Sequence, residues 1–138
     1  MKNNRVIFSS KTCEWPTPQE IFDKLNAEFH FTLDPCANDD NHKCDKYYTL
    51  ETNGLAQDWS SERIFLNPPY GRGIDKWVKK LYETNAPVKV ALLPARTDTH
   101  WFHNYVLGKA ELRFIKGRIK FGDSKSGAPF PSFLAIYR

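Results

Sequence analysis

The chain has 138 residues, of which 41% are hydrophobic and 26% charged, and its formal net charge at pH 7 is +4. A chain of this length forms one domain with a substantial core, expected here to span residues 1–138, and its composition excludes a disordered or low-complexity protein. The mildly basic charge is compatible with a polyanionic partner but does not by itself establish one.

The sequence argues against a membrane or secretory location. No apolar run approaches the roughly 18 residues of a membrane span, and too few apolar residues follow the N-terminus for a secretory signal. The three cysteines are an odd number, which argues against a disulfide framework and favours a reducing compartment. We therefore expect a cytoplasmic protein with no membrane partner.

The first expected element is a helix that begins near Thr17. Residues 1–11 are polar apart from one short apolar patch, which is compatible with a frayed arm or with an edge strand. Thr17 has the side chain of an N-cap, Pro18 suits the first helical position, and Glu20 follows the cap at capping-box spacing. The helix is expected to extend to about residue 28 because apolar residues recur at helical spacing. These residues are Ile21, Phe22, Leu25 and Phe29.

A strand and a long polar segment follow this helix. Residues 31–34 are predicted to form a strand that ends at Pro35. Asp34 would then lie at the carboxyl end of a strand, where nucleotide-type α/β folds bind their ligands. Residues 36–59 are mostly polar and are predicted to form a loop with at most a short helical turn. A loop of this length in a compact domain is typically functional or mobile.

The most informative stretch comes next, at residues 63–70. Its first four residues predict a short buried strand. Pro68 and Pro69 end that strand because neither has a backbone N–H, and the residue before a proline is disfavoured in helical angles. Asn67 is therefore expected at the strand tip, with its amide and the nearby proline carbonyls directed out of the sheet. Tyr70 follows as a flat, partly polar ring.

This tip predicts a socket for a planar group with an exocyclic NH2. The Asn67 side-chain oxygen and a backbone carbonyl, taken to be that of Pro68, would accept the two amino hydrogens and leave the nitrogen lone pair less delocalised into the ring. Tyr70 would stack on the ring, an interaction worth about 1–3 kcal/mol per base. The alternative for Tyr70 is an ordinary core tyrosine at a strand end.

The rest of the chain alternates helices and strands and then places two strands in succession. That order predicts a mainly parallel sheet with an antiparallel strand near the C-terminus. Asp98 or Thr99 is expected to cap the second of these helices. The expected elements are helices over residues 74–83 and about 99–108, and strands over residues 88–93, 111–115 and 132–137.

The tetrapeptide Asn-Pro-Pro-Tyr at residues 67–70 is similar to motif IV of the amino-methyltransferases. The surrounding sequence resembles the small phage-type DNA N6-adenine methyltransferases over nearly the whole chain. The other blocks that carry this resemblance lie at residues 13–18, 34–37, 54–55, 58–59, 93–99, 116–122 and 128–132. The resemblance implies transfer of a methyl group from S-adenosylmethionine to the N6 amino group of adenine in DNA.

The same resemblance implies a fold class. The family has an α/β, Rossmann-like methyltransferase fold with a mostly parallel sheet. Residues 35–62 are too few for the second and third strands of that sheet with their helices. We therefore expect a trimmed version of about five strands, with an antiparallel strand near the C-terminus.

Two segments are expected to hold the cofactor. Trp15, Thr17 and Pro18 match the family segment that closes over the methionine end, and Asn67 would face the same end. The alternative is that these three residues only form the capped start of a helix, and this structural role does not exclude contact with the cofactor.

The first strand supplies the second set of expected cofactor contacts. Asp34 and Pro35 resemble motif I, in which the acid would bind the methionine ammonium or its water shell. Cys36 follows where related enzymes have a glycine-rich turn, so the sequence departs from the family pattern here. Asp58 falls where the family carries an acid near the adenosine, and a plain surface acid is an equal alternative.

The target DNA is expected to contact Tyr70 and a set of cations. Arg96 would contact a phosphate or the substrate, on resemblance alone. Lys116, Arg118 and Lys120 alternate through a strand-like run, which would place three cations on one side. They would form a phosphate track, and the alternative is a solvated edge strand.

No metal site is expected. Cys36, His42 and Cys44 lack a fourth ligand at usual spacing, apart from the remote Cys13. Two other functions stay open at this point. One is a DNA-binding module that keeps the fold without catalysis, and the other is a methyltransferase that acts on RNA or on a protein amide. The recognition sequence and the oligomeric state do not follow from the sequence.

Overall fold

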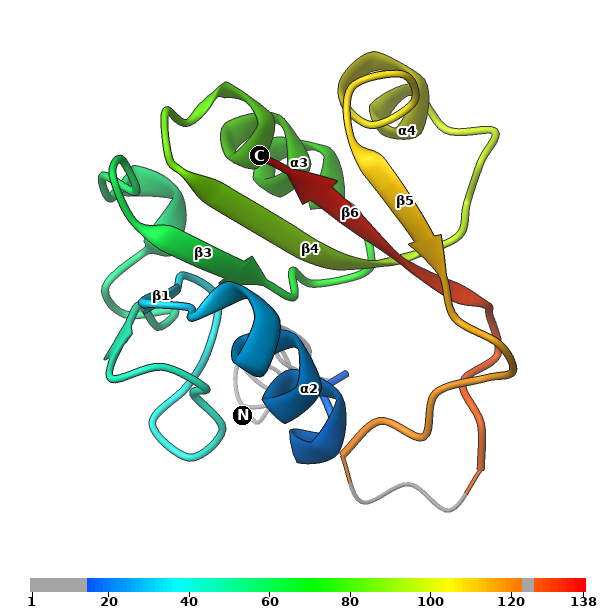
Figure 1. The fold of residues 1–138 in the computed structure, drawn as a ribbon, viewed down its shortest axis with the longest axis horizontal. Helices are drawn as coiled ribbons and strands as arrows, with labels where there is room; N and C mark the ends of the chain where they lie inside the picture. The colour runs from blue at the N-terminus through cyan, green and yellow to red at the C-terminus, as the bar shows by residue number, and fades with distance from the viewer. Residues whose placement is uncertain (1–14, 123–125) are drawn as a thin grey trace, which may run out of the picture.

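A computed structural model describes residues 15–122 and 126–138, so the arm or strand expected within residues 1–11 lies outside the described residues. Figure 1 shows a twisted sheet with helices on both sides. The helices are α2 (Gln19–Phe29), α3 (Ile74–Glu83) and α4 (His100–Tyr105), with a 3₁₀ turn, η1 (Gly54–Ala56). The strands are β1 (Leu33–Asp34), β2 (Lys46–Tyr47), β3 (Arg63–Leu66), β4 (Val88–Pro94), β5 (Glu111–Phe114) and β6 (Ser132–Tyr137).

The strand order in the sheet is β2-β1-β3-β4-β6-β5. The first four strands in this order run parallel, and β6 lies antiparallel between β4 and β5. This confirms the mostly parallel sheet with an antiparallel strand near the C-terminus. The expected number of about five strands was one too low for the described part of the chain. The extra strand is β2, which lies within the segment that was predicted to be loop.

The strand β2 has no sequence signal because it is short and weakly buried. It contains two residues, Lys46 and Tyr47, of which the first is exposed and the second half-buried. Pairing with β1 holds it in place, and the backbone N–H of Tyr48 donates to the carbonyl of Asp34 at 3.1 Å. Apolar alternation therefore could not reveal it.

The core lies on both faces of the central strands, and β4 and β6 are buried at every position. On one face, Phe22 of α2 packs edge-to-face on Phe65 of β3, with ring centroids 5.3 Å apart. On the other face, Phe102 of α4 packs on Phe133 of β6 at 5.7 Å. The sheet is therefore the middle layer between α2 and the pair α3 and α4 (Figure 1).

The predicted cap of the first helix was wrong. Pro18 is the N-cap residue of α2, no side chain in the described part of the chain caps the helix, and the Pro18 carbonyl accepts the first helical bonds. The Thr17 hydroxyl instead accepts a hydrogen bond from the side-chain amide of Asn67. The cap expected at Thr99 is confirmed, since its side chain accepts from the backbone N–H of Phe102.

The strand-like run predicted across residues 116–120 was also wrong. β5 ends at Phe114, and the backbone leaves the extended conformation at Gly117, where φ is +78°. A positive φ is readily adopted by glycine and interrupts the alternation that a strand needs. Lys116, Arg118 and Lys120 are exposed on the loop that follows β5. Among the described residues, no helix has both the length and the apolar character needed to cross a bilayer.

Candidate active site

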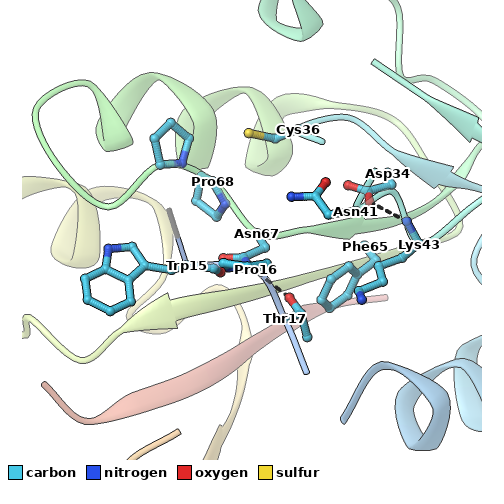
Figure 2. A pocket seen from close by; sticks show the side chains of 11 residues that line it. Trp15, Pro16, Thr17, Asp34, Cys36, Asn41, Lys43, Phe65, Asn67 and Pro68 are labelled. Atoms are coloured by element: carbon cyan, nitrogen blue, oxygen red, sulfur yellow. Dashed lines mark hydrogen bonds between the residues drawn. The ribbon is translucent and has the colours of Figure 1, made fainter. Parts of the chain in front are cut away.

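A narrow cavity lies where the parallel strands β1 and β3 end. These strands are neighbours in the sheet, so Asp34 at the end of β1 and Asn67 after β3 come to the same edge. The segment before α2 contributes Trp15, Pro16 and Thr17 to the wall of the cavity, beside Asn67 (Figure 2). The enclosed space, including its mouth, is about 360 Å³. The lining residues are Trp15, Pro16, Thr17, Asp34, Cys36, Asn41, Lys43, Phe65, Asn67, Pro68 and Pro69.

The side-chain amide of Asn67 is fixed at its nitrogen end only. Its Nδ2 donates to the Trp15 carbonyl at 2.6 Å and to the Thr17 hydroxyl at 3.0 Å. Its Oδ1 is buried and has no hydrogen-bond partner among the described residues. Buried polar atoms are nearly always paired, and an unpaired one costs about 1–3 kcal/mol. Asn67 therefore presents an unsatisfied acceptor in the wall of the cavity.

Asp34 is the buried acid of the cavity, with 4% of its surface exposed. Its Oδ2 accepts from the backbone N–H of Lys43 at 2.9 Å, and the backbone N–H of Cys36 also donates to the carboxyl. Burial raises its pKa to about 7, although the two N–H donors act in the opposite direction. A cation in the cavity would favour the ionised form of this carboxyl.

A second cavity adjoins the first and shares Cys36 with it. Counted with the open solvent at its mouth, its space is about 260 Å³. It is lined by Pro35, Cys36, Ala37, Thr49, Leu50, Asn53, Gly54 and Trp77. Gly54 stands where no side chain fits, because a Cβ there would lie 2.1 Å from the Pro35 carbonyl oxygen. The Trp59 indole N–H donates to the Gly54 carbonyl at 2.8 Å and holds the turn in place.

Tyr70 lies beneath the surface, outside the lining of the first cavity. Its hydroxyl donates to the Leu92 carbonyl at 2.8 Å, and burial raises its pKa well above the usual value. The rings of Phe121 and Phe130 pack against it edge-to-face. The described conformation therefore matches the alternative of a core tyrosine. The predicted stacking on a base stays a prediction, which requires these two rings to move.

The other residues expected at the site are spread more widely. The Arg96 guanidinium donates to the Tyr70 carbonyl at 2.9 Å and lies over the Phe130 ring. Asp58 lines neither cavity; its carboxylate is exposed and accepts from the backbone N–H of Ser60. Pro18 starts α2 without lining either cavity.

Comparison with known proteins identifies the family. The model of the family described as DNA N-6-adenine-methyltransferase (Dam) matches residues 7–132. The chain belongs to this family. Its sheet is accordingly a trimmed form of the methyltransferase fold, and in the described part of the chain β2 is the edge strand beyond β1.

Individual Dam-family relatives cover different shares of the chain. A DNA N-6-adenine-methyltransferase of Escherichia phage T1 is 36% identical over 107 residues, which are 74% of this chain and 44% of that protein. A protein of the same description from Haemophilus phage HP1 is 29% identical over 118 residues, covering 82% of this chain and 68% of that protein. The putative methyltransferase YfdM of Escherichia coli K12 is 48% identical over 65 residues, 41% of this chain and 70% of that protein. The chain thus spans less than half the length of the phage T1 relative.

Several wall residues of this Dam-family chain were not anticipated. Asn41 and Lys43 reach the cavity from the long polar segment, and Trp77 reaches the second cavity from α3. The sequence around these residues, a polar loop or a regular amphipathic helix, contains no motif that indicates a binding site. The expected absence of a metal site is untested, but among the described residues no group of three metal-ligating side chains lies together. His42 instead stacks on Tyr47, and its Nδ1 bonds to the Cys44 carbonyl.

Proposed function

We propose that this chain transfers a methyl group from S-adenosylmethionine to the N6 amino group of adenine in DNA. The observation that carries the proposal is the Oδ1 of Asn67 at the tip of β3, which is buried and has no hydrogen-bond partner within residues 15–122 and 126–138. An amino group needs acceptors, and this atom is an acceptor that no described donor satisfies. The two phage relatives are both DNA N-6-adenine-methyltransferases by name, which supports the same substrate.

The cavities have the features that S-adenosylmethionine requires. Asp34 is an acid with two N–H donors already in place, so its ionised form would hold the methionine ammonium. The second cavity, with Pro35, Ala37, Leu50 and Trp77 in its walls, would take the flat adenine ring of the cofactor. When bound, the cofactor supplies an activated methyl group attached to a sulfonium.

The residues of the chain contribute placement rather than acid–base chemistry. The Asn67 oxygen and the Pro68 carbonyl would accept the two amino hydrogens of the target adenine and direct its nitrogen lone pair toward the methyl group. These dipoles also stabilise the positive charge that develops on that nitrogen. Most of the rate then comes from holding the reacting atoms in line within a site that excludes water.

The target adenine has to leave the duplex to reach this position. Extrusion of a nucleotide costs a few kcal/mol. Lys116 and Lys120 are exposed beyond the end of β5 and would bind phosphates beside the extruded nucleotide. Arg96 donates a hydrogen bond to the Tyr70 carbonyl in the described conformation, so we assign both residues a structural role there. Tyr70 could stack on a base only after Phe121 and Phe130 move away from its ring.

The test is methyl transfer from labelled S-adenosylmethionine to duplex DNA, followed by digestion and identification of N6-methyladenine. Asn67→Ala is expected to lower the rate by at least about 100-fold, the effect of removing one preorganised polar group from an active site. Asn104→Ala, at an exposed position on α4, is the matched control. Equal rates for Asn67→Ala and the wild type would refute the assignment.

Competing substrates decide between the alternatives. RNA and a glutamine-containing peptide are added to the same assay, and adenine in DNA is expected to take the label. Calorimetry with S-adenosylmethionine addresses the third possibility, because a DNA-binding module without catalysis should not bind the cofactor.

A further inference from the structure

An asparagine amide can present either its oxygen or its nitrogen to a ligand, and only the oxygen can accept from an amino group. Near Asn67, the Trp15 carbonyl oxygen is an acceptor and cannot donate. Its 2.6 Å distance to the amide therefore requires the NH2 end on that side. The Thr17 hydroxyl, at 3.0 Å from the same nitrogen, accepts its second hydrogen. Both partners belong to the segment just before α2.

We infer that residues 15–17 are a positioning element that fixes which end of the Asn67 amide faces the target amino group. This inference rests on the proposed function and adds a role for a segment that family resemblance assigns to the cofactor. Thr17 is 5% exposed, so its hydroxyl has little access to water and is committed to the protein. Thr17 acts through Asn67 and is a positioning residue.

The inference makes asparagine and aspartate non-equivalent at position 67. An ionised aspartate has two acceptor oxygens and no donor, so one oxygen would face the Trp15 carbonyl at about the amide distance and repel it. A protonated aspartate has an O–H that can donate to that carbonyl, with its other oxygen left to accept. Asn67→Asp is therefore expected to be inactive when ionised and to regain activity when protonated.

The first experiment compares Thr17→Val with Thr17→Ser. Loss of one buried hydrogen bond is expected to lower kcat about three- to tenfold in Thr17→Val, with an unchanged Kd for S-adenosylmethionine, while Thr17→Ser keeps the wild-type kcat. NMR of the protein alone gives a readout without turnover. The side-chain NH2 protons of Asn67 should exchange faster in Thr17→Val than in the other two proteins.

Two outcomes overturn the positioning role while leaving the proposed function intact. One is a wild-type kcat and wild-type NH2 exchange in Thr17→Val. The other is a loss confined to the Kd for S-adenosylmethionine, which would make Thr17 a cofactor contact only. Failure of the proposed function itself would look different, because the wild type would then transfer no methyl group to DNA.

The second experiment measures kcat of Asn67→Asp and of the wild type from about pH 5.5 to pH 8 at saturating S-adenosylmethionine. Asp34, Cys36 and Lys43 line this cavity in both proteins, so the wild-type kcat at each pH is the reference against which the variant is compared. The ratio is expected to rise as the pH falls. A ratio that is flat or falls toward acid pH would overturn the inference.

A separate observation concerns the end of β5. Phe114 is 69% exposed, more than any other large apolar side chain in the described part of the chain. β5 and β4 are both antiparallel to β6, so they end at the same edge of the sheet. Phe114 of β5 pairs with Phe133 of β6, and Phe133 pairs in turn with Leu93 of β4. Leu66 of β3 pairs with Ala91 of β4, so two residues further along both strands Pro68 comes opposite Leu93. Phe114 is thus level with Pro68, three strand spacings or roughly 14 Å away.

The sequence after Phe114 is positively charged. Residues 115–122 contain Lys116, Arg118 and Lys120 and no acid, and all three cations are exposed. An exposed ring beside three cations complements DNA, which offers base faces between phosphates. We propose that Phe114 contacts the base stack of the substrate duplex next to the extruded adenine, with these cations on the flanking phosphates. This proposal also rests on the proposed function.

The test uses duplex DNA and single-stranded DNA of the same sequence. Phe114→Ala is expected to lower kcat/KM on the duplex about tenfold, within the range of one lost stacking contact, and to lower it much less on the single strand, where no stack needs opening. Leu107→Ala is the matched control, because Leu107 is 46% exposed but precedes β5 at the opposite edge. Equal losses on both substrates, or none on the duplex, would overturn the proposal.

Discussion

The Asp34 carboxyl is buried at the residue that ends β1, and its environment favours the neutral acid. Burial raises its pKa from 3.8 to about 7, against the pull of two backbone N–H donors. The ionised form is therefore the minor one below pH 7 and the major one above it. A bound ammonium group would stabilise the ionised form, which couples cofactor binding to proton release.

Cofactor affinity is accordingly expected to depend on pH in one direction. The Kd for S-adenosylmethionine should rise about tenfold per pH unit below about pH 7, because a raised pKa leaves less of the ionised acid as the pH falls. Calorimetry across this range measures the effect. Asp34→Asn should bind weakly with no such dependence, and a dependence that persists in this variant would assign it to another group.

The position of a single residue was predicted correctly where its immediate sequence neighbours determine it. Asn67 was expected at a strand tip, and it lies there, because two prolines stop β3 regardless of the rest of the fold. The Thr17 hydroxyl could not be assigned in this way. Its partner is 50 residues distant in sequence, and the N-cap pattern is local. Whether Asn67 binds a base remains a prediction.

Among the elements, η1 shows how a short turn supports the walls of the two cavities. Gly54 places its backbone against Pro35, directly after the strand that carries Asp34. The Trp59 indole secures the same turn from the other side. The position of Pro35 and Cys36 therefore depends on a glycine that is distant in sequence.

Gly54→Ala is expected to destabilise the protein by about 1–3 kcal/mol, the usual cost of overpacking, and to weaken S-adenosylmethionine binding. The cause is the Cβ placed 2.1 Å from a backbone oxygen that cannot rotate away. Chemical denaturation and calorimetry measure the two effects. Gly71→Ala is the control, because a Cβ at Gly71 meets no atom within 4 Å. Similar stabilities for the two variants would contradict the role of Gly54.

Elements with strong periodicity were predicted with nearly the right bounds. α3 matches because its buried stripe is regular, and β4 matches because an apolar run ends at a proline. β2 escaped prediction because only its pairing with β1 defines it. The loop after β5 was not predicted because its alternating cations have the spacing of a strand, whereas the positive φ at Gly117 interrupts the extended backbone.

At the scale of the whole molecule, the sheet collects the proposed chemistry at one edge. Asp34, Asn67 and Phe114 all lie at the carboxyl ends of strands that run in the same direction. The net charge of +4 favours the approach of a polyanion. The exposed cations beyond β5 would attract it to this end of the sheet in particular. The order of strands and helices along the chain was sufficient to predict the mostly parallel sheet with Asp34 and Asn67 at strand ends, but it did not predict the position of Phe114.

DNA binding is expected to weaken with salt through these cations. Each phosphate contact contributes about 0.9 to the slope of log K against log salt concentration, so Lys116→Gln with Lys120→Gln should reduce the slope by about 1.8. Binding titrations at several salt concentrations give the slope. The matched double variant, Lys24→Gln with Lys109→Gln, removes the same charge at exposed positions elsewhere. A comparable reduction in the control would mean that only net charge matters.

The minimal strand β2 has a dynamic consequence. Two residues that, in the described part of the chain, pair with β1 alone provide little cooperative support, whereas β4 pairs with β3 over residues 88–91 and with β6 over residues 89–94. Regions with few buried contacts open first. Backbone amides of residues 46–48 should therefore exchange with deuterium far sooner than those of β4, and S-adenosylmethionine should slow that exchange. Binding of the ligand would then limit local opening at this edge of the sheet.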